Sequence, residues 1–147
     1  MAQRLPLTET APEVYKAFTA ADQALRKGPL EPIIRELVNI RASQLNGCVF
    51  CIDMHIHEAL ELGETQDRIF QLPVWRESQL FTEAERAALA YTEAATRLSA
   101  EGVADKVWDE AAARFKPEEL GTLIGLVAFI NTWNRVGVPL RMRPPIR

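Results

Sequence analysis

The sequence predicts an all-α protein, a single-domain helical bundle of about six to seven helices, and three observations support this prediction. Capping signals recur along the chain, and each is followed by apolar residues at helical spacing. No stretch alternates with period two for long enough to be a convincing strand, and no internal repeat is obvious. A length of 147 residues is that of one ordinary domain, so we expect residues 1–147 to fold around one core.

The first half of the chain is expected to contain four helices. Thr10-Ala-Pro-Glu13 has the form of a capping box, and Gly28 is a natural stop for the helix that follows. Pro32 opens the next helix, which Asn46-Gly47 ends. Asn46 is also the expected N-cap of a third helix, which Gly63 closes. The expected ranges are 12–27, 32–45, 48–62 and, for a short fourth helix, 65–72.

Three more helices are expected in the second half. Thr82-Glu-Ala-Glu85 repeats the capping-box signal, and Ala100-Glu-Gly102 interrupts the helical pattern. Pro117-Glu-Glu places proline and acids in the first turn of the last helix, as is usual. That helix is apolar nearly all round, so we expect it to be central or to face an oligomer partner. The expected ranges are 83–98, 104–115 and 118–136, followed by an extended tail over 139–147.

Composition and charge exclude several classes of function. The chain is 48% hydrophobic and 25% charged, with a net charge of -3, which is typical of a soluble globular protein. Its Lys and Arg residues form no basic stripe, so no nucleic-acid partner is expected. The longest uncharged apolar run, Leu120 to Ile130, is far shorter than the roughly 20 residues of a membrane span. Met1 to Pro12 lacks the apolar core of a signal peptide, so we expect a cytoplasmic protein with no membrane partner.

Every cysteine and histidine lies in one stretch of ten residues, Cys48 to His57, which reads C-V-F-C-I-D-M-H-I-H. On a helix, about 100° of rotation per residue brings Cys48, Cys51 and His55 within a sector of roughly 60°. His57 falls on the opposite side. The cysteines lie at the expected helix start, where exposed backbone N–H groups and the positive end of the helix dipole stabilise a thiolate. This stretch is therefore where we expect chemistry.

Glu36 is unusually placed on the preceding helix. It lies on the expected inward face, between Ile33 and Ile40. A carboxylate in this position either reaches along the surface or is partly desolvated. An antiparallel helix hairpin would bring Glu36 over the turn that carries Cys48, so Glu36 is a candidate partner for the cysteines.

Three interpretations of the cysteine stretch compete. A C-x-x-C at a helix start suits dithiol redox chemistry, because the two sulfurs can form a disulfide while one thiol is activated and the other resolves it. A zinc site would use Cys48, Cys51 and one or both histidines, but structural zinc sites usually add two distant ligands, and the chain has none. In the third interpretation the cysteines only pack in a core helix. Because all the cysteines and histidines of the chain fall in this one stretch, the redox dithiol is the favoured interpretation.

The pattern Glu36, eleven residues, Cys48-x-x-Cys51, three residues, His55 resembles the active-site signature of the AhpD-like alkylhydroperoxidases, within the carboxymuconolactone decarboxylase superfamily. The resemblance covers about Leu30 to Arg135. It includes E-L-V-N-I-R-A-S-Q-L-N-G-C-V-F-C-I-D-M-H, W-R-E-S, F-T-E-A-E-R-A-A-L-A and I-N-T-W-N-R, which are similar to the short single-domain members.

The resemblance implies an all-helical fold, a homo-oligomer such as a trimer or hexamer, and thiol peroxidase activity. Carried over by position, Cys51 would be the peroxidatic thiol and Cys48 the partner that closes the disulfide. Glu36 would be the base, and His55 would complete the proton relay. One position departs from the pattern, because the histidine that better-studied members have between the cysteines is Phe50 here.

The sequence thus predicts an enzyme that reduces hydrogen peroxide or organic hydroperoxides. The resemblance implies an external dithiol reductant, such as a lipoyl-bearing or thioredoxin-like protein. No cofactor is expected, since neither G-x-G-x-x-G nor a P-loop occurs. The alternatives are a disulfide reductase or adaptor for a peroxiredoxin, a decarboxylase-like enzyme of the same superfamily, and a non-enzymatic oligomeric stress protein.

Overall fold

The computed structural model describes residues 2–147, and this part of the chain contains eight α-helices, one 3-10 turn and no β-strand. The all-α prediction is therefore confirmed. The helices, in chain order, are α1 Leu7–Thr10, α2 Pro12–Arg26, α3 Pro32–Asn46, α4 Val49–Glu61, α5 Gln66–Gln71, α6 Glu83–Thr96, α7 Asp105–Arg114 and α8 Pro117–Leu140, with the 3-10 turn η1 Leu72–Val74 between α5 and α6.

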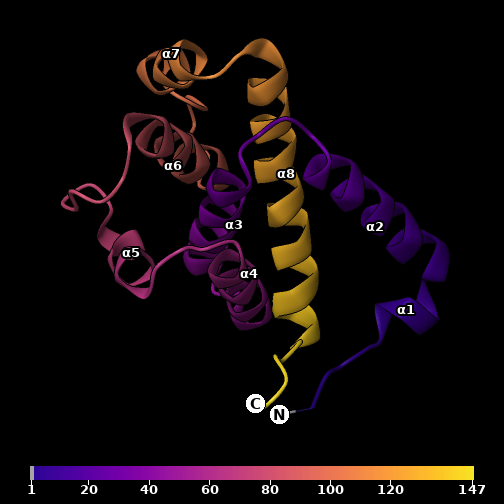
Figure 1. Cartoon of the computed structure of the whole chain (residues 1–147). Helices are drawn as coiled ribbons and strands as arrows, with labels where there is room; N and C mark the ends of the chain where they lie inside the picture. The colour runs from indigo at the N-terminus through magenta and orange to yellow at the C-terminus, as the bar shows by residue number, and fades with distance from the viewer. Residues whose placement is uncertain (1) are drawn as a thin grey trace.

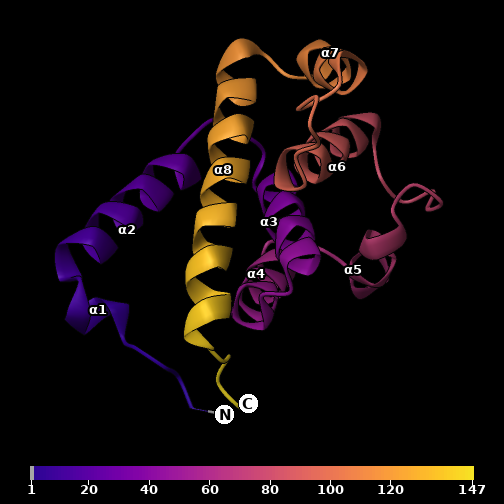
Figure 2. The same cartoon turned by 180° about the vertical axis from the view of Figure 1, so that it is seen from behind.

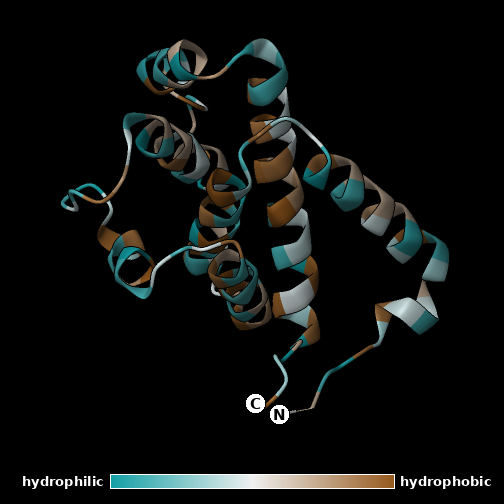
Figure 3. Cartoon of the chain, viewed as in Figure 1, coloured by the Kyte–Doolittle hydropathy of each residue, from teal (hydrophilic) through white to brown (hydrophobic). Residues whose placement is uncertain are grey.

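Helix α8 is the long central rod of the molecule (Figure 1). Helices α3, α4, α6 and α7 pack on one side of it, and α1 and α2 form an arm on the other side, as the view from behind also shows (Figure 2). Hydrophobic residues run along much of α8 (Figure 3). By length and composition α8 is also the one helix in residues 2–147 that could cross a membrane, a test that the core helix of a soluble protein passes as well.

Local signals set most helix ends. Gly47 takes a left-handed conformation at φ 69°, which ends α3 and turns the chain into α4. Thr82 and Glu85 form the expected capping box at the start of α6. The capping box expected at Thr10 does not form. The chain up to Thr10 forms the short helix α1 instead, and α2 starts after Ala11 without a side-chain cap.

Two expectations at helix ends are wrong. The N-cap of α4 is Cys48 and not Asn46, whose side-chain amide instead donates hydrogen bonds to Asn131 and Asn134 of α8. The last helix includes Pro139 and ends at Leu140, so the extended tail begins two residues later than expected. Helix α8 tolerates Pro139 because its final turn is closed by other bonds, among them the 3.0 Å bond from the Met142 N–H to the Gly137 carbonyl.

The core lies between α3, α6 and α8, and a smaller apolar cluster surrounds the start of α4. That cluster contains Ala42, Cys48, Cys51 and Ile130, with Phe50 and Trp133 packed against it. Helix α2 contributes no buried residue. The cysteines therefore lie where the arm, α4 and α8 meet.

Candidate functional site

Cys48 and Cys51 form a disulfide at the start of α4, with their Cα atoms 5.3 Å apart. Both are buried, with exposed fractions of 1% and 3%. Cys48 caps the helix, since its sulfur accepts a hydrogen bond from the Cys51 N–H at 3.3 Å. Gly137 of α8 lies against the pair, and a Cβ atom there would be 3.0 Å from Cys48 Sγ. A glycine at this position lets α8 cover the sulfurs.

Glu36 and His55 form a buried pair beside the cysteines. Their exposed fractions are 0% and 2%, and Glu36 Oε2 lies 2.7 Å from His55 Nδ1. The other carboxylate oxygen accepts a hydrogen bond from Arg35 Nε at 2.8 Å. The pair exists because α3 and α4 pack as consecutive helices across the Gly47 turn, which places residue 36 opposite residue 55. Glu36 is thus fully desolvated and does not reach along the surface.

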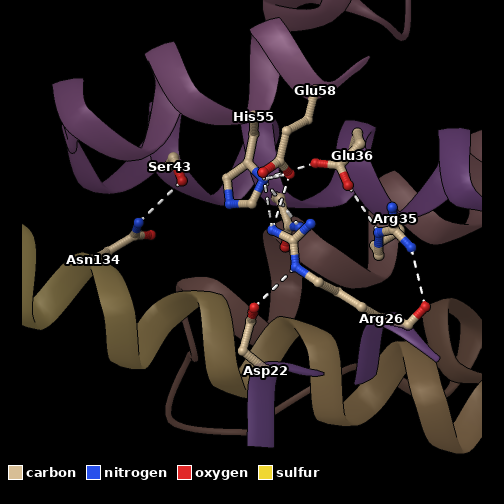
Figure 4. A network of polar contacts seen from close by, with 9 residues as sticks. Asp22, Arg26, Arg35, Glu36, Ser43, His55, Glu58 and Asn134 are labelled. Atoms are coloured by element: carbon tan, nitrogen blue, oxygen red, sulfur yellow. Dashed lines mark hydrogen bonds and ion pairs between the residues drawn. The ribbon is translucent and has the colours of Figure 1, made fainter. Parts of the chain in front are cut away.

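A second carboxylate faces the same imidazole nitrogen. Glu58 Oε2 lies 3.5 Å from His55 Nδ1 and 2.9 Å from an Arg26 guanidinium nitrogen. The contact between Glu58 Oε2 and Arg26 is an ion pair, because its geometry is not that of a hydrogen bond. Asp22, one turn before Arg26 on α2, holds the guanidinium at 2.9 Å. Figure 4 shows these side chains converging on His55 from three helices.

The result is a chain of alternating charges that runs from the buried Glu36–His55 pair to the partly exposed Glu58 and Arg26. Arg35, Glu36, His55, Glu58 and Arg26 follow one another, and each carboxylate lies between cationic groups when the imidazole is protonated. Burial disfavours the imidazolium, but the contacts with Glu36 and Glu58 outweigh it and raise the pKa of His55 above its ordinary value. The contact with His55, together with Arg26, lowers the pKa of Glu58 to about 2.

A cavity of about 270 Å³ lies over Cys51 and His55. The arm of α1 and α2 forms one wall, and α4 with α8 forms the other. Most of its lining is apolar. The residues around it are Gln3, Leu7, Thr8, Tyr15, Thr19, Asp22, Arg26, Phe50, Cys51, Met54, His55, Ile130, Trp133, Val136, Gly137, Leu140 and Met142. A small molecule in this cavity would therefore lie against Cys51.

Cys48 is bonded to Cys51, Glu36 contacts His55 at 2.7 Å, and Cys51 and His55 line the same cavity. That these four residues form a catalytic site stays a prediction. His57 does not join them. Its side chain is 47% exposed and lies 3.6 Å from Asp53, so the two histidines do not converge on the cysteines as one of the zinc hypotheses requires. Phe50 packs against the cysteines and lines the cavity.

Sequence reasoning missed the outer part of the charge chain. Glu58 carried a usable signal, because it lies three residues after His55 and so shares its helix face. Asp22 and Arg26 carried none, since they come from α2, 29 residues or more before His55, and only the packing of α2 brings them near.

Glu36, His55 and Glu58 also have the spacing of a cation site, with one ligand atom each within 4.8 Å of the others. Two guanidinium groups already occupy the carboxylates, however, Arg35 on Glu36 and Arg26 on Glu58. The positive charge beside these carboxylates therefore comes from the two arginines.

The fold and the site define an all-helical protein with a dithiol at a helix start, and comparison with known proteins places it further. Residues 12–94, more than half of the chain, match the carboxymuconolactone decarboxylase family. The chain is 34% identical over 143 residues to YdfG, an uncharacterised protein of Bacillus subtilis, with 97% of each chain covered. It belongs to the carboxymuconolactone decarboxylase family and, within it, is AhpD-like.

Solved structures of other proteins share this fold. A protein of unknown function from Agrobacterium tumefaciens, for which a role as the antioxidant defence protein AhpD has been suggested, superposes with a TM-score of 0.95 at 35% identity, over 99% of this chain and all of that one. The debrominase Bmp8 superposes with a TM-score of 0.81 at 20% identity, over 92% of this chain and 73% of that one. The second likeness concerns the fold alone.

Proposed function

We propose that this protein is a thiol-dependent peroxidase that reduces hydroperoxides through a Cys48–Cys51 dithiol and disulfide cycle. The observation that carries the proposal is the bonded cysteine pair at the start of α4, beneath a cavity and beside the buried Glu36–His55 pair. A nucleophilic thiol, a resolving thiol and a proton relay are the three parts that such a reaction needs. Membership of the family supports the proposal.

In the first half of the cycle, the Cys51 thiolate attacks the terminal oxygen of the hydroperoxide. The O–O bond breaks, Cys51 becomes a sulfenic acid, and the peroxide leaves as an alkoxide. The thiol proton passes to Glu36, directly or through water, and the Glu36–His55 pair returns a proton to the alkoxide, which leaves as an alcohol. Cys51 lines the cavity and Cys48 does not, which favours Cys51 as the attacking thiol.

In the second half, the Cys48 thiol attacks the sulfenic sulfur of Cys51. The new S–S bond releases the oxygen as water, and the product is the disulfide. An external dithiol then donates two electrons and two protons and restores both thiols. We propose a lipoyl-bearing or thioredoxin-like protein for this step, because the chain contains no other cysteine that could supply the electrons.

Mass spectrometry after one equivalent of peroxide tests the proposal. The reduced wild-type protein should form the Cys48–Cys51 disulfide, and only Cys48→Ser should retain a sulfenate that a dimedone probe traps. A sulfenate on Cys48 in the Cys51→Ser protein would reverse the two roles. If one equivalent of peroxide leaves both thiols of the wild type intact, the protein is not a peroxidase.

The same proteins separate the competing functions. A disulfide reductase or adaptor would resist peroxide but exchange rapidly with an oxidised peroxiredoxin, and both cysteines would be required. A decarboxylase-like enzyme would act on a lactone acid and keep its activity when both cysteines are serines. A non-enzymatic stress protein would show none of these activities.

We propose in addition that the protein is a homo-oligomer. Helix α2 buries no side chain within one chain, although Val14, Phe18 and Leu25 make one of its faces apolar. Packing between copies would cover such surface. We also keep the expectation of a cytoplasmic location, where reducing conditions would return the disulfide to the dithiol.

A further inference from the structure

We propose that the cavity over Cys51 selects compact, uncharged aryl hydroperoxides, such as cumene hydroperoxide, over hydrogen peroxide and over long-chain fatty acid hydroperoxides. This inference rests on the proposed peroxidase function, and it narrows the substrate class. Three features of the cavity carry it: aromatic rings in its lining, a small volume and the absence of an unpaired cation among the described residues that line it.

Three aromatic side chains from three helices contribute to the lining. Tyr15 comes from α2, Phe50 from α4 and Trp133 from α8. The Trp133 ring is held in place by edge-to-face contacts, with ring centroids 5.8 Å from Tyr15, 5.7 Å from Phe18 and 6.1 Å from Phe129. Aromatic rings prefer edge-to-face and offset partners, so a wall fixed in this way favours a flat ring as guest. Because the wall is formed in advance, little ordering is needed on binding.

The volume sets the size of the guest. At about 270 Å³ the cavity holds about nine times the roughly 30 Å³ that one water molecule occupies in the liquid. Hydrogen peroxide would fill a small part of it and would touch few of the apolar walls. A long fatty acyl chain would need far more room. A phenyl ring with a short branched alkyl peroxide matches the space.

The charges that line the cavity disfavour a substrate that carries a carboxylate. Arg26 is the one cation among the described residues that line the cavity, and it is already paired with Asp22 at 2.9 Å and with Glu58 at 2.9 Å. A carboxylate on the substrate would have to displace one of these partners, and it would meet the negative charge of both. An uncharged substrate has no such cost.

The N-terminal segment is tied to the end of α8 beside the cavity. The Arg4 N–H donates to the Leu140 carbonyl at 3.0 Å, and the Arg4 guanidinium donates to the Pro139 carbonyl at 3.2 Å. Tyr15 lines the cavity from α2 and contacts Trp133, and it is the residue we expect to discriminate by size and shape.

Ligand binding can be measured without catalysis. The probe is 2-phenyl-2-propanol, the alcohol that cumene hydroperoxide yields, added to the oxidised protein, which cannot react with it. The three tryptophans give three indole N–H signals in a ¹H–¹⁵N spectrum, and Trp133→Phe identifies one of them. We expect the Trp133 signal to shift saturably, while Trp75 and Trp108, which lie outside this cavity, do not move.

Kinetics supply the second test. Cumene hydroperoxide and tert-butyl hydroperoxide differ by a phenyl group in place of a methyl group. We expect kcat/KM to be at least tenfold higher for cumene hydroperoxide than for tert-butyl hydroperoxide, and lower again for hydrogen peroxide and for linoleic acid hydroperoxide. Burial of one ring supports a difference of this size.

The variant Tyr15→Leu should reduce the preference for cumene hydroperoxide over tert-butyl hydroperoxide at least threefold. Phe70→Leu, the same kind of change on an exposed ring of α5, is the control and should leave this preference and the rate with hydrogen peroxide unchanged. Equal rates for the matched pair, or a Trp133 signal that 2-phenyl-2-propanol does not move, would overturn the inference even if peroxides are reduced. A saturable Trp133 shift in a protein that reduces no peroxide would support the ligand class and refute the peroxidase function.

Discussion

At the scale of single residues, the site depends on charges that neutralise one another, from the fully buried Glu36 to the partly exposed Glu58 and Arg26. Glu36 is fully buried, and its two carboxylate oxygens contact Arg35 and His55. A buried charge needs such partners to offset the loss of hydration. Glu58 gives His55 a second anionic neighbour, and Arg26 prevents the two carboxylates from repelling each other strongly. The contacts with both carboxylates raise the pKa of His55, and in the proposed mechanism this favours the imidazole as the proton donor to a leaving alkoxide.

We predict that Glu58→Gln lowers the pKa of His55, because it removes an anion 3.5 Å from Nδ1. The charged groups around this imidazole are Glu36 with Arg35 from α3, Glu58 from α4, and Arg26 with Asp22 from α2, and the Asn39 amide lies 3.4 Å from Nδ1. The wild type keeps the imidazolium to higher pH than the variant. The alkaline limb of the peroxide-reduction profile should therefore move to lower pH in Glu58→Gln.

Imidazole NMR titration measures this pKa directly, since the chain has two histidines and His57→Gln assigns the signals. Glu61→Gln removes the same charge from an exposed position one turn further along the sequence and should leave the His55 titration unchanged. Glu36→Gln, which removes the carboxylate at 2.7 Å, should lower the pKa more than Glu58→Gln does. A His55 pKa equal to that of the wild type in folded Glu58→Gln protein would contradict the role of Glu58.

At the scale of helices, the close approach of α8 to the start of α4 shapes the site. Gly137 is buried and lets the α8 backbone pass directly over the two sulfurs. The neighbouring turn of α8 supplies Asn134, whose amide donates to Ser43 of α3 at 3.0 Å and fixes the distance between α3 and α8. Three helices are thus held together within a few ångströms of the disulfide.

We predict that Gly137→Ala destabilises the protein by roughly 1–3 kcal/mol, because the new Cβ would lie 3.0 Å from Cys48 Sγ and 3.7 Å from Cys51 Sγ. Urea unfolding of the oxidised protein measures the change. Gly121→Ala is the matched control on the same helix, since no atom lies within 4 Å of its added Cβ. The better helix propensity of alanine should stabilise that variant by up to about 1 kcal/mol. Similar unfolding free energies for the two variants would show that α8 does not press on the sulfurs.

At the scale of the whole molecule, the arm of α1 and α2 is held to the bundle by few contacts. They include the aromatic contacts of Tyr15 and Phe18 with Trp133, the packing of Leu25 against the core, the ion pair of Arg26 with Glu58 and the bonds of Arg4 to the end of α8. A helix that buries none of its side chains gains little from its own chain. The same arm forms one wall of the cavity, so the stability of the arm and the shape of the cavity depend on each other.

We predict that light scattering after size-exclusion chromatography gives a mass three or six times the 16.5 kDa of one chain. Association would cover the apolar face of α2 and steady the cavity wall. The measurement should be made on oxidised and on reduced protein, because the disulfide is internal to one chain and should not change the mass. A mass of one chain at micromolar concentration would refute the oligomer.

The sequence by itself determined the helical fold and the inner site. Periodicity, capping residues and glycines act within a few residues of one another, so they could be identified before any packing was known, as could the common helix face of Cys48, Cys51 and His55. Glu36 could be inferred because a short turn makes its helix antiparallel to α4. Only the tertiary structure decided that Arg26 and Asp22 complete the charge chain and that Gly137 covers the sulfurs. It also decided that Tyr15 and Trp133 wall the cavity. These contacts join segments more than 25 residues apart, and their formation depends on how the helices pack, which no local pattern encodes.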